Sequence, residues 1–201
     1  MKISKIEPQK RNKKRSSIYI DGEFAFGLSN ELVLKYNLNA DDEISDTLIK
    51  DVLLEEEKQK IKQRAFRLLQ YRDRSIQELA NRLLRIGFDN RLVQSVIEDF
   101  KAEGTLDDEK FANAFVSDYT TLNPRGNRFI IQELQKRGVA KEIISKVVHE
   151  RDENFLIKDY IERKLSHLNR NEPREKQKIV RRLLMRGFSS GAIYEVLNEE
   201  R

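Results

Sequence analysis

The sequence predicts a mainly helical protein of three tandem three-helix repeats, preceded by a small module that contains a β-hairpin. The main observation is a sequence motif that recurs around Gly87, Gly138 and Gly187: a leucine four residues before the glycine and a bulky apolar residue after it. The glycines lie about 50 residues apart, a spacing typical of units that stack on their neighbours. We therefore expect an elongated, curved array of repeats that works through an extended surface.

These patterns predict four segments along the 201 residues. The N-terminal module with its β-hairpin and helices occupies 1–58. The helical repeats follow at 59–104, 105–152 and 153–201.

A tight turn is predicted in the N-terminal module. Apolar residues alternate on both sides of Asp21-Gly22, a pair typical of two-residue hairpin turns. After the hairpin, Ser29 is suited to cap a short helix, and a further helix is expected from about Asp46 into the first repeat. Because a two-stranded hairpin is marginal alone, we expect it to pack on helices or on a partner.

Each repeat is predicted to contain a helix hairpin with a fixed corner. The recurring glycine suits a left-handed residue that ends one helix, and the apolar residue after it can pack across the start of the next. Ser75 and Glu78 form a capping box that opens the second helix of the first repeat. Asp107 is suited to cap the first helix of the second repeat, with Leu106 and Phe111 packing around it.

Chemistry that would indicate an enzyme is scarce in this sequence. Asp107 and Asp108 are adjacent and would point in different directions on a helix, and capping already explains the first. His149 and His167 are far apart without a ligand pattern, and the chain has no cysteine. We therefore expect no catalytic residues, no cofactor, no bound metal and no disulfide.

Composition points to a solvated helical protein, with 36% charged and 38% hydrophobic residues. No apolar run is long enough to cross a membrane, and no secretory signal is recognised. We expect a cytoplasmic monomer that makes no membrane contact.

Opposing blocks of charge lie along the chain. Residues 1–16 and the third repeat are basic, whereas 41–57 are acidic, and the net charge is +5. Such clusters attract phosphate backbones or acidic protein surfaces, although a solvated helix face is the simpler reading of any one of them. The candidate contacts with a partner or with DNA are Lys13, Lys14, Arg15, Arg72, Arg74, Arg125, Arg128, Arg181, Arg182 and Arg186.

A series of short motifs follows in order along the first two repeats: Arg72-Asp73-Arg74-Ser75, Glu78-Leu79, Gly87-Phe88, Leu106-Asp107-Asp108, Phe111-Ala112, Gly126 before Ile130, Glu133-Leu134 and Gly138-Val139. On these residues the sequence resembles the RecX family of recombinase regulators. The match is densest from about residue 60 to 150, and the third repeat has no Asp-Asp-x-x-Phe-Ala phrase before Phe155. The resemblance implies three tandem three-helix repeats. It also implies a non-enzymatic regulator that binds RecA filaments on DNA and restrains recombination, ATP turnover and the coprotease activity of the damage response.

A second reading is a sequence-independent nucleic-acid-binding helical repeat protein. Its partner would be the DNA or RNA itself. Binding to phosphates alone should weaken steeply with ionic strength, which separates the two readings.

Overall fold

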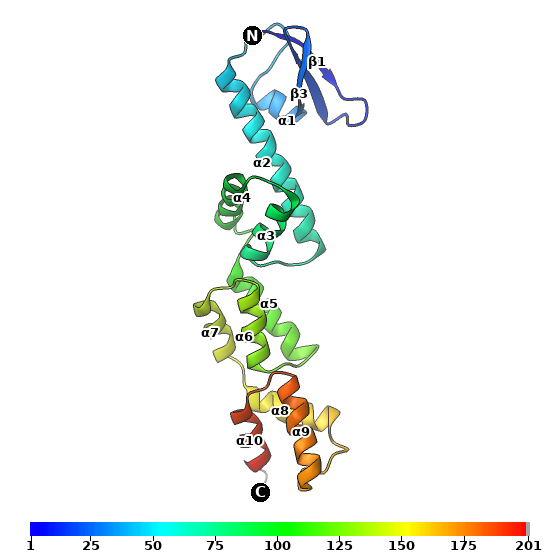
Figure 1. Cartoon of the computed structure of the whole chain (residues 1–201), viewed down its shortest axis with the longest axis vertical. Helices are drawn as coiled ribbons and strands as arrows, with labels where there is room; N and C mark the ends of the chain where they lie inside the picture. The colour runs from blue at the N-terminus through cyan, green and yellow to red at the C-terminus, as the bar shows by residue number, and fades with distance from the viewer. Residues whose placement is uncertain (200–201) are drawn as a thin grey trace. The chain divides into compact units, whose positions relative to one another are not determined.

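The structure is a computed structural model that describes residues 1–199, and within them it contains three β-strands and ten α-helices (Figure 1). These residues form two compact units, which we describe separately. One comprises Met1–Tyr71 and Leu83–Glu98, and the other comprises Arg72–Arg82 and the chain from Asp99 onward. The mainly helical fold class is confirmed, and the curvature expected of the array stays a prediction.

A three-stranded antiparallel sheet forms the N-terminal module (Figure 1). The hairpin prediction is confirmed: β2 (Arg15–Ile20) and β3 (Glu23–Ser29) are joined by Asp21 (φ 51°) and Gly22 (φ 93°). Positive φ at both central residues matches the right-handed twist of the strands. The sequence did not predict β1 (Ile3–Pro8), which pairs with β2. Its register shifts between Ile3 and Lys5, and such a bulge breaks the alternation by which a strand is recognised.

Two helices complete this module. Ser29 caps α1 (Asn30–Lys35) by accepting a hydrogen bond from the Leu32 amide. The helix α2 (Asp46–Tyr71) is one continuous element, so the boundary that we expected after residue 58 falls inside it. Residues from the sheet and both helices share one buried cluster: Ile3, Ile18, Leu28, Leu32, Leu38, Ile44 and Val52. The hairpin therefore does pack on helices.

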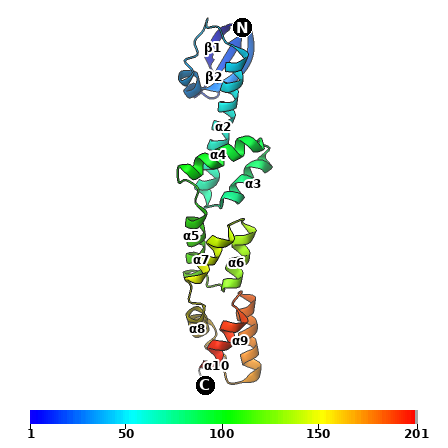
Figure 2. The same ribbon diagram turned by 90° about the vertical axis from the view of Figure 1, so that its left-hand side faces the viewer.

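Three helices per repeat are confirmed. The end of α2 is followed by α3 (Ile76–Ile86) and α4 (Asn90–Ala102) in the first repeat. The second has α5 (Asp108–Thr121), α6 (Asn127–Lys136) and α7 (Lys141–His149), and the third has α8 (Glu153–Lys164), α9 (Pro173–Met185) and α10 (Ser190–Glu199) (Figure 2). Within the second and third repeats, α5 packs against α7 and α8 against α10.

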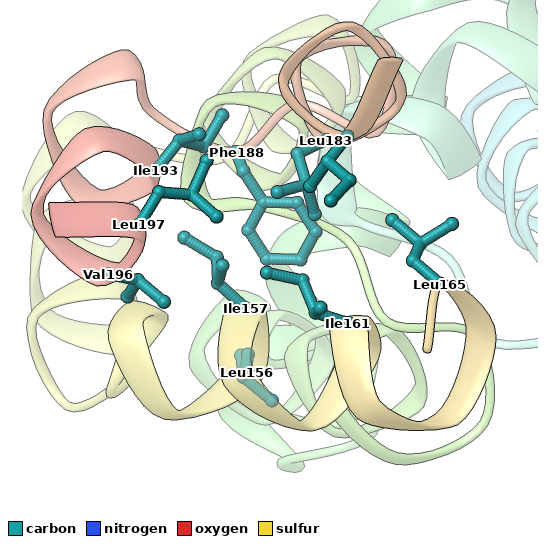
Figure 3. Close-up of a cluster of buried hydrophobic side chains, with 10 residues drawn as sticks. Leu156, Ile157, Ile161, Leu165, Leu183, Phe188, Ile193, Val196 and Leu197 are labelled. Carbon is teal, nitrogen blue, oxygen red and sulfur yellow. The ribbon is translucent and has the colours of Figure 1, made fainter. Parts of the chain in front are cut away.

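The apolar residue after the second and the third glycine serves the core of its repeat. In the third repeat the ring of Phe188 is fully buried, and it lies among Leu183, Ile193, Ile157 and Ile161 (Figure 3). The second repeat has an equivalent cluster: Ala112, Ile130, Leu134, Val139, Ile144 and Val147. The same sequence motif thus contributes to equivalent cores in the second and third repeats.

The glycines end their helices as predicted, with φ of 103° at Gly87, 75° at Gly138 and 81° at Gly187. Their surroundings differ. A Cβ atom at Gly87 would meet nothing within 4 Å, whereas one at Gly138 would lie 2.5 Å from Cβ of Gln77, and one at Gly187 would lie 2.7 Å from the backbone nitrogen of Phe129. The second and third glycines are therefore also points of close packing on the preceding repeat.

Candidate interaction surface

An arginine stands directly before the second and third of these glycines and packs on an aromatic ring of its own repeat. The guanidinium carbon of Arg137 lies 4.8 Å from the ring centre of Phe115, and that of Arg186 lies 4.6 Å from the ring centre of Tyr160. Both distances allow cation–π attraction. Each arginine thus fixes the helix corner against the first helix of its repeat.

The same two arginines also reach the preceding repeat. Arg137 Nε lies 3.8 Å from a carboxylate oxygen of Glu78. Arg186 donates from Nε to the carbonyl of Pro124 (3.0 Å) and from Nη2 to the side-chain oxygen of Asn123 (2.6 Å). These contacts use the Arg186 guanidinium within the fold, and a part for this residue in partner binding stays a prediction.

The helix corner also meets the start of the preceding repeat's second helix. At the first junction, the hydroxyl of Ser75 donates to the carbonyl of Arg137 (2.5 Å). At the equivalent place in the next junction, the backbone N–H of Gly126 donates to the carbonyl of Arg186 (3.1 Å). A Cβ atom on Gly126 would lie 2.1 Å from the backbone of Phe188, so the second junction is the more closely packed.

A carboxylate at the start of each following repeat completes the junction. Asp108 accepts a hydrogen bond from the N–H of Ile76 (2.9 Å), and Glu153 accepts one from the N–H of Asn127 (2.7 Å). Each acid therefore satisfies a free N–H of a helix in the repeat before it. This role of Asp108 could not be predicted from the sequence, because its partner lies 32 positions earlier.

The two neighbouring aspartates differ in environment. Asp107 caps its own helix as predicted, accepting from the N–H groups of Glu109 and Lys110, and these bonds hold the pKa of its carboxyl below the ordinary value. Burial raises the pKa of the Asp108 carboxyl, and the bond from Ile76 only partly opposes it. Both serve the structure.

Two further candidates, Arg15 and Arg72, are held by carboxylates. Arg15 forms an ion pair with Glu56 (2.5 Å), a carboxylate that is only 3% exposed and also accepts from the N–H of Ser29. Arg72 makes two hydrogen bonds to Glu78 (3.0 and 3.1 Å). Burial acts to raise the pKa of Glu78, but Arg72, the N–H of Ser75 and Arg137 together outweigh it and leave that pKa below its usual value. These ion pairs give Arg15 and Arg72 a role in the fold, and their part in binding a partner stays a prediction.

The remaining candidate contacts with a partner or with DNA differ in how exposed their side chains are. Arg74 is half-buried, and Arg125 is half-buried with its guanidinium 4.9 Å from the ring centre of Phe129. The exposed ones lie in the β1–β2 connection, at the start of α6 and on α9: Lys13, Lys14, Arg128, Arg181 and Arg182. None of these five side chains forms an ion pair with the part of the chain that the structure describes.

The helix α9 carries the densest exposed charge of the third repeat. Arg174, Lys178, Arg181 and Arg182 are all exposed along it. Such a face attracts phosphate groups or carboxylates. Across residues 1–199 no group of three His, Asp or Glu side chains is placed to hold a metal ion, and no helix there is long and apolar enough to cross a membrane.

Comparisons with known proteins cover nearly the whole chain. Four family models match in order: the regulatory protein RecX N-terminal domain (1–45) and the first, second and third three-helix domains of RecX (62–100, 107–148 and 156–197). A regulatory protein RecX of Clostridioides difficile (strain 630) is 32% identical across 98% of this chain and 94% of its own length. One of Clostridium perfringens (strain 13 / Type A) is also 32% identical, across 98% and 93%.

A solved structure described as a crystal structure of regulatory protein RecX is similar to this chain with a TM-score of 0.75 and 25% identity, over 98% of both chains. A RecX structure from Lactobacillus salivarius agrees in fold, with a TM-score of 0.60 at 20% identity over 71% of this chain and 96% of that one. With four matching domains in the order of the three repeats and their N-terminal module, the chain belongs to the RecX family of regulatory proteins.

Proposed function

We propose that this protein is a non-enzymatic regulator that binds RecA recombinase filaments on DNA and mainly inhibits their activity. It would thereby act in DNA repair, recombination and the SOS response. The observation that supports this most is the exposed basic face of α9 in a chain of the RecX family. The face has no counter-charge on its own helix beyond the first turn, where Glu175 lies.

The junctions between repeats suit a protein that makes several weak contacts at once. The backbone N–H groups of Gly126 and Asn127 donate to the carbonyl of Arg186 and to the carboxylate of Glu153, which joins the second and third repeats. Partner contacts made by the two repeats therefore keep a fixed spacing. When one contact has formed, the others become intramolecular and gain effective concentration. A filament, in which one surface repeats along its length, offers such a series of sites.

The mixed charge of the chain favours a protein partner over bare nucleic acid. Its 39 basic and 34 acidic residues include the acidic stretch 41–57, which repels the backbone that the basic blocks attract. At about 150 mM salt, exposed charges more than roughly 8 Å apart are largely screened. We expect inhibition of the recombinase to persist there while binding to bare single-stranded DNA is weak.

The experiment measures DNA-dependent ATP hydrolysis by a purified RecA-type recombinase across a salt titration. The variant Arg181→Glu/Arg182→Glu should inhibit less than the wild type because it reverses the exposed charge of α9. Lys141→Glu/Lys164→Glu is the control, since it makes the same change of charge at exposed positions of α7 and α8. Undiminished inhibition by the α9 variant, with a native circular dichroism spectrum, would place the contact elsewhere.

A second candidate function is sequence-independent binding of nucleic acid. The exposed cations of the β1–β2 connection favour it: Lys10, Arg11, Lys13 and Lys14. In the same titration, an excess of competitor DNA would abolish the inhibition if affinity for DNA explained all of it. The variant Lys13→Glu/Lys14→Glu would then lose inhibition and DNA binding in parallel.

A further inference from the structure

A groove runs along the third repeat between α9 and α10. Its volume is about 660 Å³. Its lining residues are Pro173, Lys176, Gln177, Val180, Arg181, Leu184, Met185 and Tyr194. All but Tyr194 lie on α9 at intervals of three and four residues, so they form one stripe about 18 Å long.

The groove exposes large apolar side chains that the core of the repeat does not use. Leu184 is 42% exposed, Met185 75% and Tyr194 50%. Their neighbours Leu183 and Ile193 belong to the buried cluster, and these three do not. Folding of the repeat therefore gives no reason for apolar residues at these positions.

The other repeats support this conclusion, because they place different residues at the same positions. Relative to the glycine, Leu184, Met185 and Tyr194 stand at −3, −2 and +7. The second repeat has a smaller groove there, of about 370 Å³, with polar Gln135 and Ser145 in its lining. The equivalent triplets are Gln135, Lys136 and Ser145 in the second repeat and Leu84, Arg85 and Gln94 in the first. Only the third repeat is apolar at all three.

The charge around the groove is positive. Arg181 lines it, and Arg174, Lys178 and Arg182 are exposed on the same helix. Lys176 also lines it, with its ammonium bonded to the side-chain oxygen of Asn198 (3.1 Å). A basic rim around an apolar floor fits a ligand with apolar anchors and flanking carboxylates.

We propose that this groove binds one amphipathic helix of a partner protein, with apolar side chains seated on Leu184, Met185 and Tyr194 and carboxylates beside Arg181. The stripe on α9 has the length and spacing that match anchors at i, i+3 or i+4, and i+7 of a docked helix. Met185 adds an adaptable contact, as methionines do in other peptide-binding grooves. The apolar floor distinguishes this site from a simple phosphate-binding face. The groove would bind a helix of this kind whether or not the recombinase is the protein that carries it.

The test uses the full chain and a fluorescent helical peptide of about 16 residues, with leucines at intervals of three and four and glutamates on the flanks. The variant Leu184→Gln/Met185→Lys/Tyr194→Ser installs the residues that the second repeat has at these positions. Leu122→Gln is the control, since Leu122 is 81% exposed on another part of the surface. By fluorescence anisotropy we expect the triple variant to bind at least about tenfold more weakly than the wild type, and the control to bind equally well.

Two further measurements separate the alternatives. A peptide with lysines in place of the glutamates should bind at least about tenfold more weakly, and the acidic peptide should shift backbone amide signals of α9 and α10 in NMR spectra. Tyr194→Ser alone serves if the triple variant does not fold. No binding of the acidic peptide, or equal binding by the triple variant, would overturn the proposal. The proposal would also be overturned if the wild type formed a dimer in sedimentation velocity and the triple variant did not. The occupant of the groove would then be a second copy of the chain.

Discussion

Replacing Gly126 by alanine should separate the second and third repeats. The new Cβ atom would lie 2.1 Å from Cα and from the backbone nitrogen of Phe188. Relief to an ordinary contact of about 3.4 Å requires a backbone shift of about 1.3 Å, because no flexible side chain can give way. Two backbone hydrogen bonds, each 3.1 Å long, cross the junction here: Gly126 to Arg186 and Arg128 to Gly187. Both would be stretched beyond bonding distance.

The expected loss of stability combines these effects. Overpacking of a rigid site costs about 1–3 kcal/mol, and each lost backbone hydrogen bond costs about 1 kcal/mol. We therefore expect Gly126→Ala to lower the free energy of unfolding by about 3–5 kcal/mol. For a chain of this size, every 1 kcal/mol corresponds to about 2–4 °C in melting temperature.

The assay is thermal and urea unfolding followed by circular dichroism. Gly191→Ala is the matched control, because a Cβ atom at this exposed position of α10 would meet nothing within 4 Å. That change should stabilise the helix by up to about 1 kcal/mol. A melting temperature of Gly126→Ala within about 2 °C of the wild type would refute the close contact between these repeats.

Substitutions at Gly138, Asp108 and Arg15 test the structural roles of single residues. Gly138→Val should destabilise the protein by about 1–2 kcal/mol more than Gly87→Val in urea unfolding, because both strain the backbone but only the first overlaps a neighbour; equal losses would contradict this. Asp108→Ala should cost about 1 kcal/mol through the lost acceptor. Folding raises the pKa of Asp108, so the contribution of this carboxyl to stability falls as pH rises through that pKa. The melting temperature of Asp108→Asn should therefore rise relative to that of the wild type between pH 4 and pH 7. A difference in melting temperature that stays constant with pH would refute the shift. Arg15→Ala should destabilise the N-terminal module by about 3 kcal/mol in chemical denaturation, because Glu56 would remain buried without its partner; a loss below about 1 kcal/mol would show that water reaches the carboxylate.

Much of the fold could be predicted because its determinants are local in sequence. Turn residues such as Asp21-Gly22, the cap at Asp107 and the glycine helix stops act within a few positions of themselves. The strand β1 escaped prediction because a bulge interrupts its pattern. A helix running from about Asp46 into the first repeat was predicted, and α2 is that helix, so it passes through the segment boundary expected after residue 58.

The candidate surface could be predicted only in part. Composition identifies basic residues but not their partners, and the carboxylate that holds Arg15 lies 41 positions away. Arg186 looked like part of the same cluster as Arg181, yet it faces the carbonyl of Pro124, which is 62 positions earlier. A basic cluster in sequence therefore mixes residues that hold the fold together with residues that are free to bind.

The repeat junction also bears on how such an array could be lengthened. A second copy of 105–152, inserted after the first, would set Gly126 and Asn127 of one copy against the corner at Arg137 and the helix start at Asp108 of the next. Each of these groups already makes the required kind of bond in the native chain: Asn127 donates to an acid, Asp108 accepts from a helix N–H, and the carbonyl of Arg137 accepts a hydrogen bond. The chain thus contains a unit whose two ends are chemically compatible with each other, so the number of repeats can change by duplication without the invention of a new interface.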